Sequence, residues 1–275
     1  MTLPNFLIIG AAKGGTTSLY RYLGQHPDIY MSPMKEPNYF TDEDQLFSKR
    51  SVRSRSEYER LFDGVNGEHA IGEATPRYLT SIGAAGRIHA DLPGVRLIAT
   101  LRQPAERAYS AYLMRFTDSR ESASAEEVLQ PGTDYFESGL YHAQLQRYFD
   151  TFPCDQIKVI LFEDLIASPR ETVRSLFAFL GVDPDFDVDT SIRFNRSFLP
   201  RFVRLTRLFN ATAASVAQNA PWASGTGLGT PFRRLLLRHP DPIPLSLRRR
   251  LTEQYRDDII ATGKLIGRDL SHWLK

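Results

Sequence analysis

The stretch FLIIGAAKGGTTS, residues 6–18, decides the fold of this chain. Residues 6–10 are an apolar run of strand length that stops at a glycine, and an amphipathic segment with Leu19 and Leu23 one helical turn apart follows the loop. This order predicts a strand, a short glycine loop and a helix start, which present backbone N–H groups and a positive dipole end to an anion. The sequence therefore predicts a phosphate-binding loop.

The residue types of the predicted loop suit a phosphate-like group. Gly14 and Gly15 allow the main chain to approach an anion closely, and Lys13 supplies a positive charge. In the loop G-x-x-x-x-G-K-[ST] of nucleoside-triphosphate enzymes the lysine follows the second glycine, whereas here it lies inside the loop. A plain glycine turn would explain the glycines, but not the lysine and the hydroxyl donors that follow. These donors are Thr16, Thr17 and Ser18.

Short apolar segments alternate with helical patterns along the chain. This alternation predicts an α/β fold with a central parallel sheet and helices on both faces. The expected strands are 6–10, 70–73, 95–101 and 157–162. One expected helix begins at Pro104, and others cover 140–149, 169–180 and about 247–265. Residues 211–230 have the composition of a loop.

Length and composition favour one globular domain covering residues 1–275. The single cysteine, Cys154, excludes an intrachain disulfide and agrees with a reducing compartment. There is no signal-peptide pattern at the start and no apolar run near the ~20 residues that span a bilayer, so we expect a cytoplasmic protein without a membrane span. The six histidines lack metal-ligand spacing, so no metal is expected.

The phosphate loop and several motifs downstream resemble the sulfotransferases that use 3′-phosphoadenosine-5′-phosphosulfate (PAPS). Within that superfamily the chain is most similar to the heparan sulfate sulfotransferases and their bacterial homologues. The resemblance implies a three-layer sandwich like that of the P-loop NTPases, with PAPS as the sulfuryl donor, 3′-phosphoadenosine-5′-phosphate (PAP) as the product and no metal. It is weakest over about 194–244, a variable segment. The motifs that carry it are KEPNYF (35–40), GEATP (72–76), LRQPAERAYS (101–110), GLY (139–141) and GRDLSHW (267–273).

The resemblance assigns roles to two groups of cofactor-binding residues. Lys13 would neutralise the oxygen that bridges phosphorus and sulfur, and the other loop residues would hold the remaining oxygens of the 5′-phosphosulfate. Arg102 and Ser110 would bind the 3′-phosphate. The ordinary alternative is an Arg102 that pairs with Glu106 and a Ser110 that faces solvent.

Two carboxylates compete for the role of the base that takes the acceptor's proton. Glu36 falls on the catalytic glutamate of the heparan sulfate enzymes, in a Glu-x-x-Phe-Phe-like motif, and is our preferred base. Glu73 matches an acid of a second motif, where a structural or acceptor-orienting role is the other interpretation. Asn38 stands where some relatives carry a histidine. Either acid could instead be an ordinary partner of a neighbouring cation.

Two other functions are compatible with parts of the sequence. One is a P-loop-like kinase or nucleotide hydrolase, against which the lysine placement counts. The other is a non-enzymatic module that binds anions, nucleic acid or sulfated glycans, through residues 193–250, which contain eleven arginines and one acid. We favour transfer to a hydroxyl or amine of a saccharide, lipid or natural product, with a small-molecule or saccharide acceptor and no nucleic acid as partner.

Overall fold

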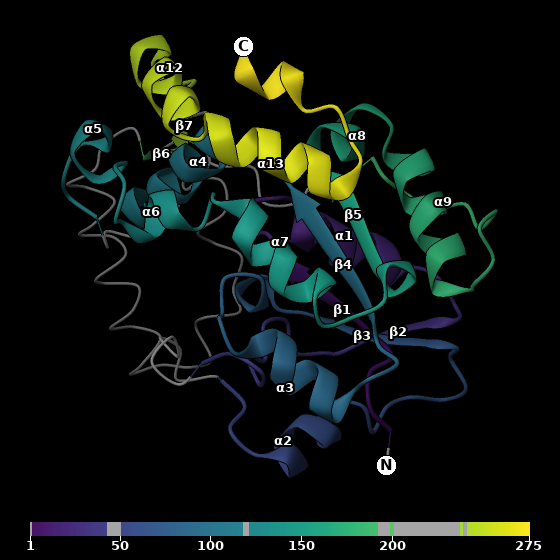
Figure 1. Cartoon of the computed structure of the whole chain (residues 1–275). Helices are drawn as coiled ribbons and strands as arrows, with labels where there is room; N and C mark the ends of the chain where they lie inside the picture. Colours follow the sequence, from purple (N-terminus) through teal and green to yellow (C-terminus); the bar gives the residue numbers. More distant parts are fainter. Residues whose placement is uncertain (1, 43–50, 118–120, 192–198, 201–236, 239–240) are drawn as a thin grey trace.

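The structure is a computed structural model that describes residues 2–42, 51–117, 121–191, 199–200, 237–238 and 241–275 (Figure 1). Its centre is a sheet of five parallel strands in the order β2-β3-β1-β4-β5. These strands are β1 (Phe6–Gly10), β2 (Ile29–Met31), β3 (Ala70–Ala74), β4 (Arg96–Leu101) and β5 (Ile157–Leu161). A separate antiparallel pair joins β6 (Leu199–Pro200) and β7 (Leu237–Arg238).

Helices of very different length connect the strands and complete the chain. They are α1 (Thr16–Leu23), α2 (Arg55–Arg60), α3 (Ala84–Asp91), α4 (Pro104–Thr117), α5 (Ala125–Val128), α6 (Asp134–Glu137), α7 (Tyr141–Phe149), α8 (Phe162–Ala167), α9 (Pro169–Leu180), α12 (Leu245–Gln254) and α13 (Arg256–Ile266). Short 3₁₀ turns lie at Pro76–Tyr78, Cys154–Gln156 and Ser271–Leu274.

The side chains of β1 belong alternately to two hydrophobic cores. Leu7 and Ile9 lie in the larger core, to which α3, α4, α7, α12 and α13 contribute. Phe6 and Ile8 lie in the other core, which α1 and α9 complete. Because successive side chains of a strand point to opposite faces, a fully buried strand needs helices on both sides. The chain is therefore the three-layer α/β sandwich that the sequence predicts (Figure 1).

The strand order puts the end of β1 at a topological switch point. From β1 the chain continues to β2 and β3 on one side, and then crosses to β4 and β5 on the other side. Ligands of open parallel sheets bind at such a point, outside the carboxyl ends of the strands. Residues 11–15 follow β1, and Arg102 follows the adjacent β4, so both lie at this edge of the sheet.

The predicted strands agree with the structure to within one residue at each end, but two other features differ. Strand β2 was not predicted, because three residues are too few for a periodic pattern. The single helix predicted over 247–265 is wrong: α12 and α13 meet at Tyr255, whose ring stacks on Phe136 at a centroid distance of 4.2 Å. The predicted loop 211–230, and most of the variable segment 194–244, lie outside the described residues.

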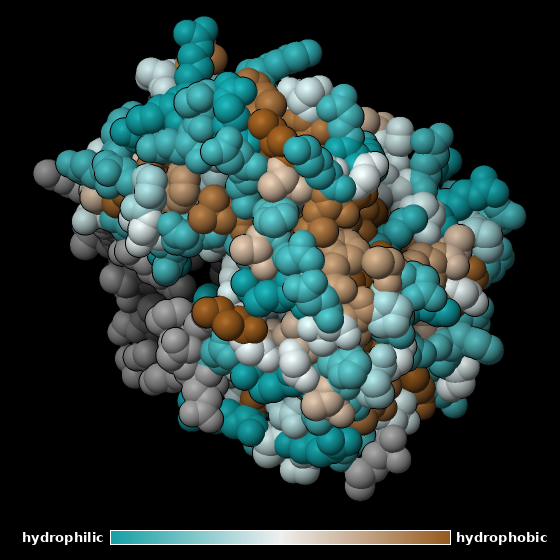
Figure 2. All heavy atoms as spheres, in the orientation of Figure 1, coloured by the Kyte–Doolittle hydropathy of each residue, from teal (hydrophilic) through white to brown (hydrophobic). Residues whose placement is uncertain are grey.

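None of the helices in the described part of the chain is long and apolar enough to cross a membrane. On the face drawn in Figure 2 hydrophilic groups predominate, and hydrophobic groups gather over the region where Figure 1 draws α7 and α13. Ile260 of α13 is one of the large hydrophobic residues with an exposed side chain.

Candidate active site

Residues 11–15, which the sequence predicts to bind phosphate and which are called the phosphate loop below, are held against β4 by two hydrogen bonds. The Ala11 N–H donates to the Thr100 carbonyl oxygen (2.7 Å), and the Thr100 hydroxyl donates to the Gly14 carbonyl oxygen (2.7 Å). A Cβ atom at Gly14 would lie 2.5 Å from the Thr100 carbonyl oxygen, which is too close for any side chain. The loop and the strand are therefore in direct backbone contact, and only glycine fits this position.

Helix α1 begins directly after the loop without a side-chain cap. Gly15 precedes the helix in a left-handed conformation (φ 93°). The first turn contains hydroxyls and no acidic residue, and Thr16 within it is buried. This helix start therefore combines a positive dipole end with hydroxyl donors, which favours a bound anion. The residues of the turn are Thr16, Thr17 and Ser18.

Lys13 extends from the loop to α4. Its backbone is left-handed (φ 71°), a conformation that is uncommon for a residue with a side chain and that concentrates at functional sites. Its Nζ donates to the Sδ of Met114 on α4, at 3.5 Å. Sequence reasoning did not identify Met114, because no local pattern links residues 101 positions apart.

Arg102 and the phosphate loop meet at Phe162, the first residue of α8. The Arg102 Cζ lies 4.9 Å from the centroid of the Phe162 ring. A Cβ atom at Gly15 would lie 2.9 Å from Cδ2 of the same ring. Burial lowers the pKa of Arg102 from its ordinary value, but a guanidinium keeps its charge at neutral pH. A half-buried cation beside the loop favours a second anionic group there.

Arg102 lies between β4 and α4, and Glu106 and Ser110 follow it at intervals of four residues on α4. The ion pair between Arg102 and Glu106 is present, with Nη2 and Oε2 3.7 Å apart. Ser110, in contrast, is buried rather than turned to solvent. Arg248 of α12 adds a second cation, because its Nε lies 3.3 Å from the Glu106 Oε1. Sequence reasoning did not identify Arg248, which comes from a helix 142 residues further along the chain.

Glu73, on β3, is completely buried. Its carboxyl group accepts hydrogen bonds from the hydroxyls of Thr75 (2.8 Å) and Tyr58 (3.4 Å). Burial raises the pKa of Glu73 to about 7, although hydrogen bonds from these hydroxyls and from Tyr78 lower it. The negative charge of Glu36 also raises this pKa, which indicates that the two carboxylates are close enough to interact.

Glu36 lies at the same edge of the sheet but is accessible. Its backbone N–H donates to the carbonyl oxygen of Ala74, at the end of β3 (3.0 Å). Its side chain is 51% exposed and pairs with Lys35, whose Nζ lies 2.6 Å from Oε1. The end of β3 therefore brings together one accessible and one buried carboxylate.

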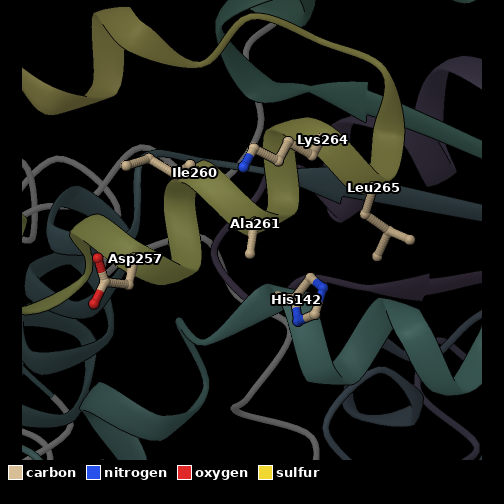
Figure 3. Close-up of a pocket in the computed structure, with 6 residues that line it drawn as sticks. All are labelled: His142, Asp257, Ile260, Ala261, Lys264 and Leu265. Atoms are coloured by element: carbon tan, nitrogen blue, oxygen red, sulfur yellow. The ribbon is translucent and has the colours of Figure 1, made fainter.

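A groove of about 460 Å³ lies elsewhere, between α7 and α13 (Figure 3). The predicted cofactor residues do not line it, so we do not assign it to the chemistry at the phosphate loop. The groove is lined by His142, Asp257, Ile260, Ala261, Lys264 and Leu265.

Metal-binding groups were a separate question. In the ranges that it covers, the structure describes no group of three or more His, Cys, Asp or Glu residues that could hold a metal.

Comparison with known proteins gives consistent results. The family model described as "Sulfotransferase family" matches residues 41–187. The crystal structure of a sulfotransferase from Alicyclobacillus acidocaldarius superposes with a TM-score of 0.78 and 35% sequence identity, and the alignment covers 100% of both chains.

Curated relatives give the same result at lower identity. Human heparan sulfate glucosamine 3-O-sulfotransferase 6 is 29% identical over 261 residues, which cover 92% of this chain and 69% of the relative. Mouse heparan sulfate glucosamine 3-O-sulfotransferase 3A1 is 29% identical over 189 residues, which cover 66% of this chain and 46% of the relative. The chain therefore spans only part of the length of these relatives.

We expect Glu73→Gln to change how stability depends on pH. In the wild type the folded state holds the Glu73 proton more tightly than the unfolded state, because the pKa rises from 4.5 to about 7. Stability contributed by this proton is therefore present below about pH 4.5 and is lost as the pH rises through about 7, by about 3 kcal/mol in all. In urea unfolding, the free energy of unfolding of the variant relative to that of the wild type should rise by roughly this amount between about pH 5 and about pH 8. Equal pH dependence would contradict a buried, ionisable Glu73.

Proposed function

The chain belongs to the sulfotransferase family, and on this premise we propose that it transfers the sulfuryl group of PAPS to a hydroxyl group of a saccharide or small-molecule acceptor. The observation that carries the proposal is the meeting of two cationic sites at Phe162, the Lys13 loop and Arg102. PAPS carries two anionic groups on one ribose, the 5′-phosphosulfate and the 3′-phosphate, so two adjacent cationic sites suit it. Amine, lipid and natural-product acceptors are the alternatives that the same site would serve.

The residues around the loop fit the 5′-phosphosulfate. The Gly14 N–H donates to the Ala11 carbonyl oxygen within the loop (2.9 Å), so the groups proposed to face the anion are the first amides of α1 and the positive end of its dipole. The hydroxyls of the first helical turn add donors, and no carboxylate of that turn opposes the negative charge. In this proposal Arg102 and the buried Ser110 hold the 3′-phosphate. The hydroxyls are those of Thr16, Thr17 and Ser18.

Sulfuryl transfer breaks one S–O bond of the donor while the acceptor oxygen forms another. By analogy with phosphoryl transfer, in-line displacement depends on positioning and on stabilising the charge of the leaving oxygen. Lys13 is the group proposed to neutralise that oxygen. Its left-handed backbone supports this role, because such conformations concentrate at functional sites, and its side chain extends out of the loop to α4.

The acceptor must also lose a proton, and accessibility favours Glu36 as the base. Glu73 has a pKa of about 7, a value that would suit a base at neutral pH. A base must nevertheless reach the proton that it removes, and Glu73 is completely buried with its carboxyl group bonded to internal hydroxyls. Glu36 is half exposed, so its carboxylate is accessible to an acceptor, which supports the choice of Glu36. We therefore assign proton removal to Glu36.

Family membership favours this function over the two alternatives that the sequence left open. A P-loop-like kinase carries its lysine directly after the second glycine of the loop, whereas Lys13 lies between Gly10 and Gly15. A non-enzymatic anion-binding module would need no base and no buried Ser110. Calorimetry with PAP, ATP and a DNA oligomer separates the three, because only the proposed function requires selective binding of PAP.

We expect the protein to bind PAP at least about tenfold more tightly than adenosine 5′-phosphate, a difference of about 1.4 kcal/mol. The reason is that the charged Arg102 and the Ser110 hydroxyl contact only the 3′-phosphate. Arg102→Met and Ser110→Ala should lose this preference in calorimetry. Arg174→Met is the matched control, since Arg174 lies on α9 and pairs with Asp185 at the surface. Equal affinity of the wild type for both nucleotides would contradict PAPS as the donor.

Lys13→Met should lower kcat by about 10²-fold or more while PAP affinity changes by less than about fivefold. Methionine is also unbranched and is only one heavy atom shorter than lysine, so the variant removes chiefly the charge. The readouts are turnover of radiolabelled PAPS and calorimetric binding of PAP, with Lys264→Met on α13 as the control. Near-normal turnover of the variant would contradict the proposal that Lys13 neutralises the leaving oxygen and would leave it at most a role in binding.

Glu36→Gln should lower kcat by about 10²-fold with nearly unchanged PAP affinity, because glutamine retains the size of the side chain but accepts no proton. Glu73→Gln should cost less in kcat. The acceptor for these assays comes from a screen of labelled PAPS against heparan sulfate oligosaccharides, bacterial polysaccharides and small hydroxylated metabolites. If Glu73→Gln proved the more damaging change, the role of base would pass to Glu73.

A further inference from the structure

The turn that carries Glu36 is conformationally costly. Glu36 and Asn38 both have left-handed backbones, with φ of 62° and 58°, and Pro37 lies between them. In addition, the buried Oδ1 of Asn38 has no hydrogen-bond partner. Left-handed residues with side chains persist only where their surroundings enforce them. Some part of the structure must therefore hold this turn in shape.

Hydrogen bonds to the end of β3 and to the residue after it hold the turn in place. The Glu36 N–H donates to the Ala74 carbonyl oxygen (3.0 Å), and the Asn38 N–H donates to the Thr75 Oγ1 (3.4 Å). Within the turn, the Asn38 Nδ2 donates to the Glu36 carbonyl oxygen (2.6 Å). The backbone on each side of Pro37 is thus tied to the residues that follow Glu73.

The Thr75 hydroxyl is the central group of this arrangement. It has one proton to donate, and it donates it to the Glu73 Oε2 at 2.8 Å. Its lone pairs are therefore directed away from Glu73, and one of them accepts the Asn38 N–H. A fully buried carboxyl group is costly to maintain, and here it determines the direction of the hydroxyl that supports the turn.

Aromatic residues secure the far ends of this network. The Tyr58 hydroxyl donates to the other oxygen of Glu73, and the Tyr58 ring stacks on Tyr39 with centroids 4.4 Å apart. The next residue, Phe40, donates its backbone N–H to the Tyr78 hydroxyl (3.4 Å). Both the acid and the chain that leaves the turn are thus fixed by buried groups.

We propose that Glu73, Thr75 and Asn38 are positioning residues, which hold the left-handed turn so that the Glu36 carboxylate stays directed at the acceptor. This inference rests on the proposed role of Glu36 as the base. It gives the buried Glu73 a function without contact to any substrate, and it explains why an asparagine, which tolerates the left-handed conformation better than most residues, occupies position 38.

The decisive comparison is Thr75→Val with Thr75→Ser. Valine has the shape of threonine without the hydroxyl, whereas serine retains the hydroxyl. Thr75→Val should accelerate amide hydrogen exchange in the peptide that spans residues 36–40 and lower the kcat for release of PAP from PAPS, with water as the acceptor, by about tenfold. PAP affinity should stay within about twofold, and Thr75→Ser should stay within about threefold of the wild type in every readout.

Thr172→Val is the matched control, because Thr172 is also buried and its hydroxyl bonds the Ser168 carbonyl oxygen on the distant α9 (2.9 Å). It should lose stability but retain exchange in residues 36–40 and kcat. Unchanged exchange in Thr75→Val, or faster exchange with unchanged kcat, would overturn the inference. The exchange experiment needs no PAPS, so a wild type that fails to bind PAP would contradict the proposed function and not the support of the turn.

Discussion

The candidate site depends on one backbone contact, the approach of the phosphate loop to β4. There is no space for a Cβ atom between Gly14 and the carbonyl group of Thr100, and the Thr100 hydroxyl closes the contact with a hydrogen bond. Lys13 precedes Gly14 directly, and Arg102 follows Thr100 by two residues. Two cationic side chains are therefore held by the central strands of a rigid sheet. This matters because sulfuryl transfer, like phosphoryl transfer, depends on positioning more than on covalent chemistry of the protein.

Charge is distributed unequally around this contact. On the α4 side, Glu106 lies between the guanidinium groups of Arg102 and Arg248, so the acid is compensated and a positive balance remains for an anion. On the β3 side, two neighbouring carboxyl groups differ in burial. Glu73 is withdrawn from water and its pKa rises to about 7, whereas Glu36 stays accessible and pairs with Lys35. Two acids of the same chemistry thus acquire different properties from their surroundings alone.

Much of this could be predicted from local patterns. The loop around Lys13 and the order of strands and helices are visible in a few consecutive residues, because a strand, a glycine loop and a helix start are determined by near neighbours. Strand β2 was not predicted because it is too short for a pattern. The break at Tyr255 was not predicted because no glycine or proline near it marks a helix end, and the contact of its ring with Phe136 joins two distant parts of the chain. Met114 and Arg248 carry no local signal of their contacts with Lys13 and Glu106.

The sequence by itself determined the fold class, the family resemblance and the residue types of the site, because apolar periodicity, glycine placement and motif spacing are properties of neighbouring residues. It named Glu36 as the preferred base and Glu73 as the competing acid, but it gave no physical difference between them. Only the tertiary structure decided that Glu73 is fully buried and Glu36 exposed, and that Thr75 joins Glu73 to the turn at Asn38. The physical reason is that burial, and with it the pKa of a carboxyl group, depends on which distant side chains exclude water from it.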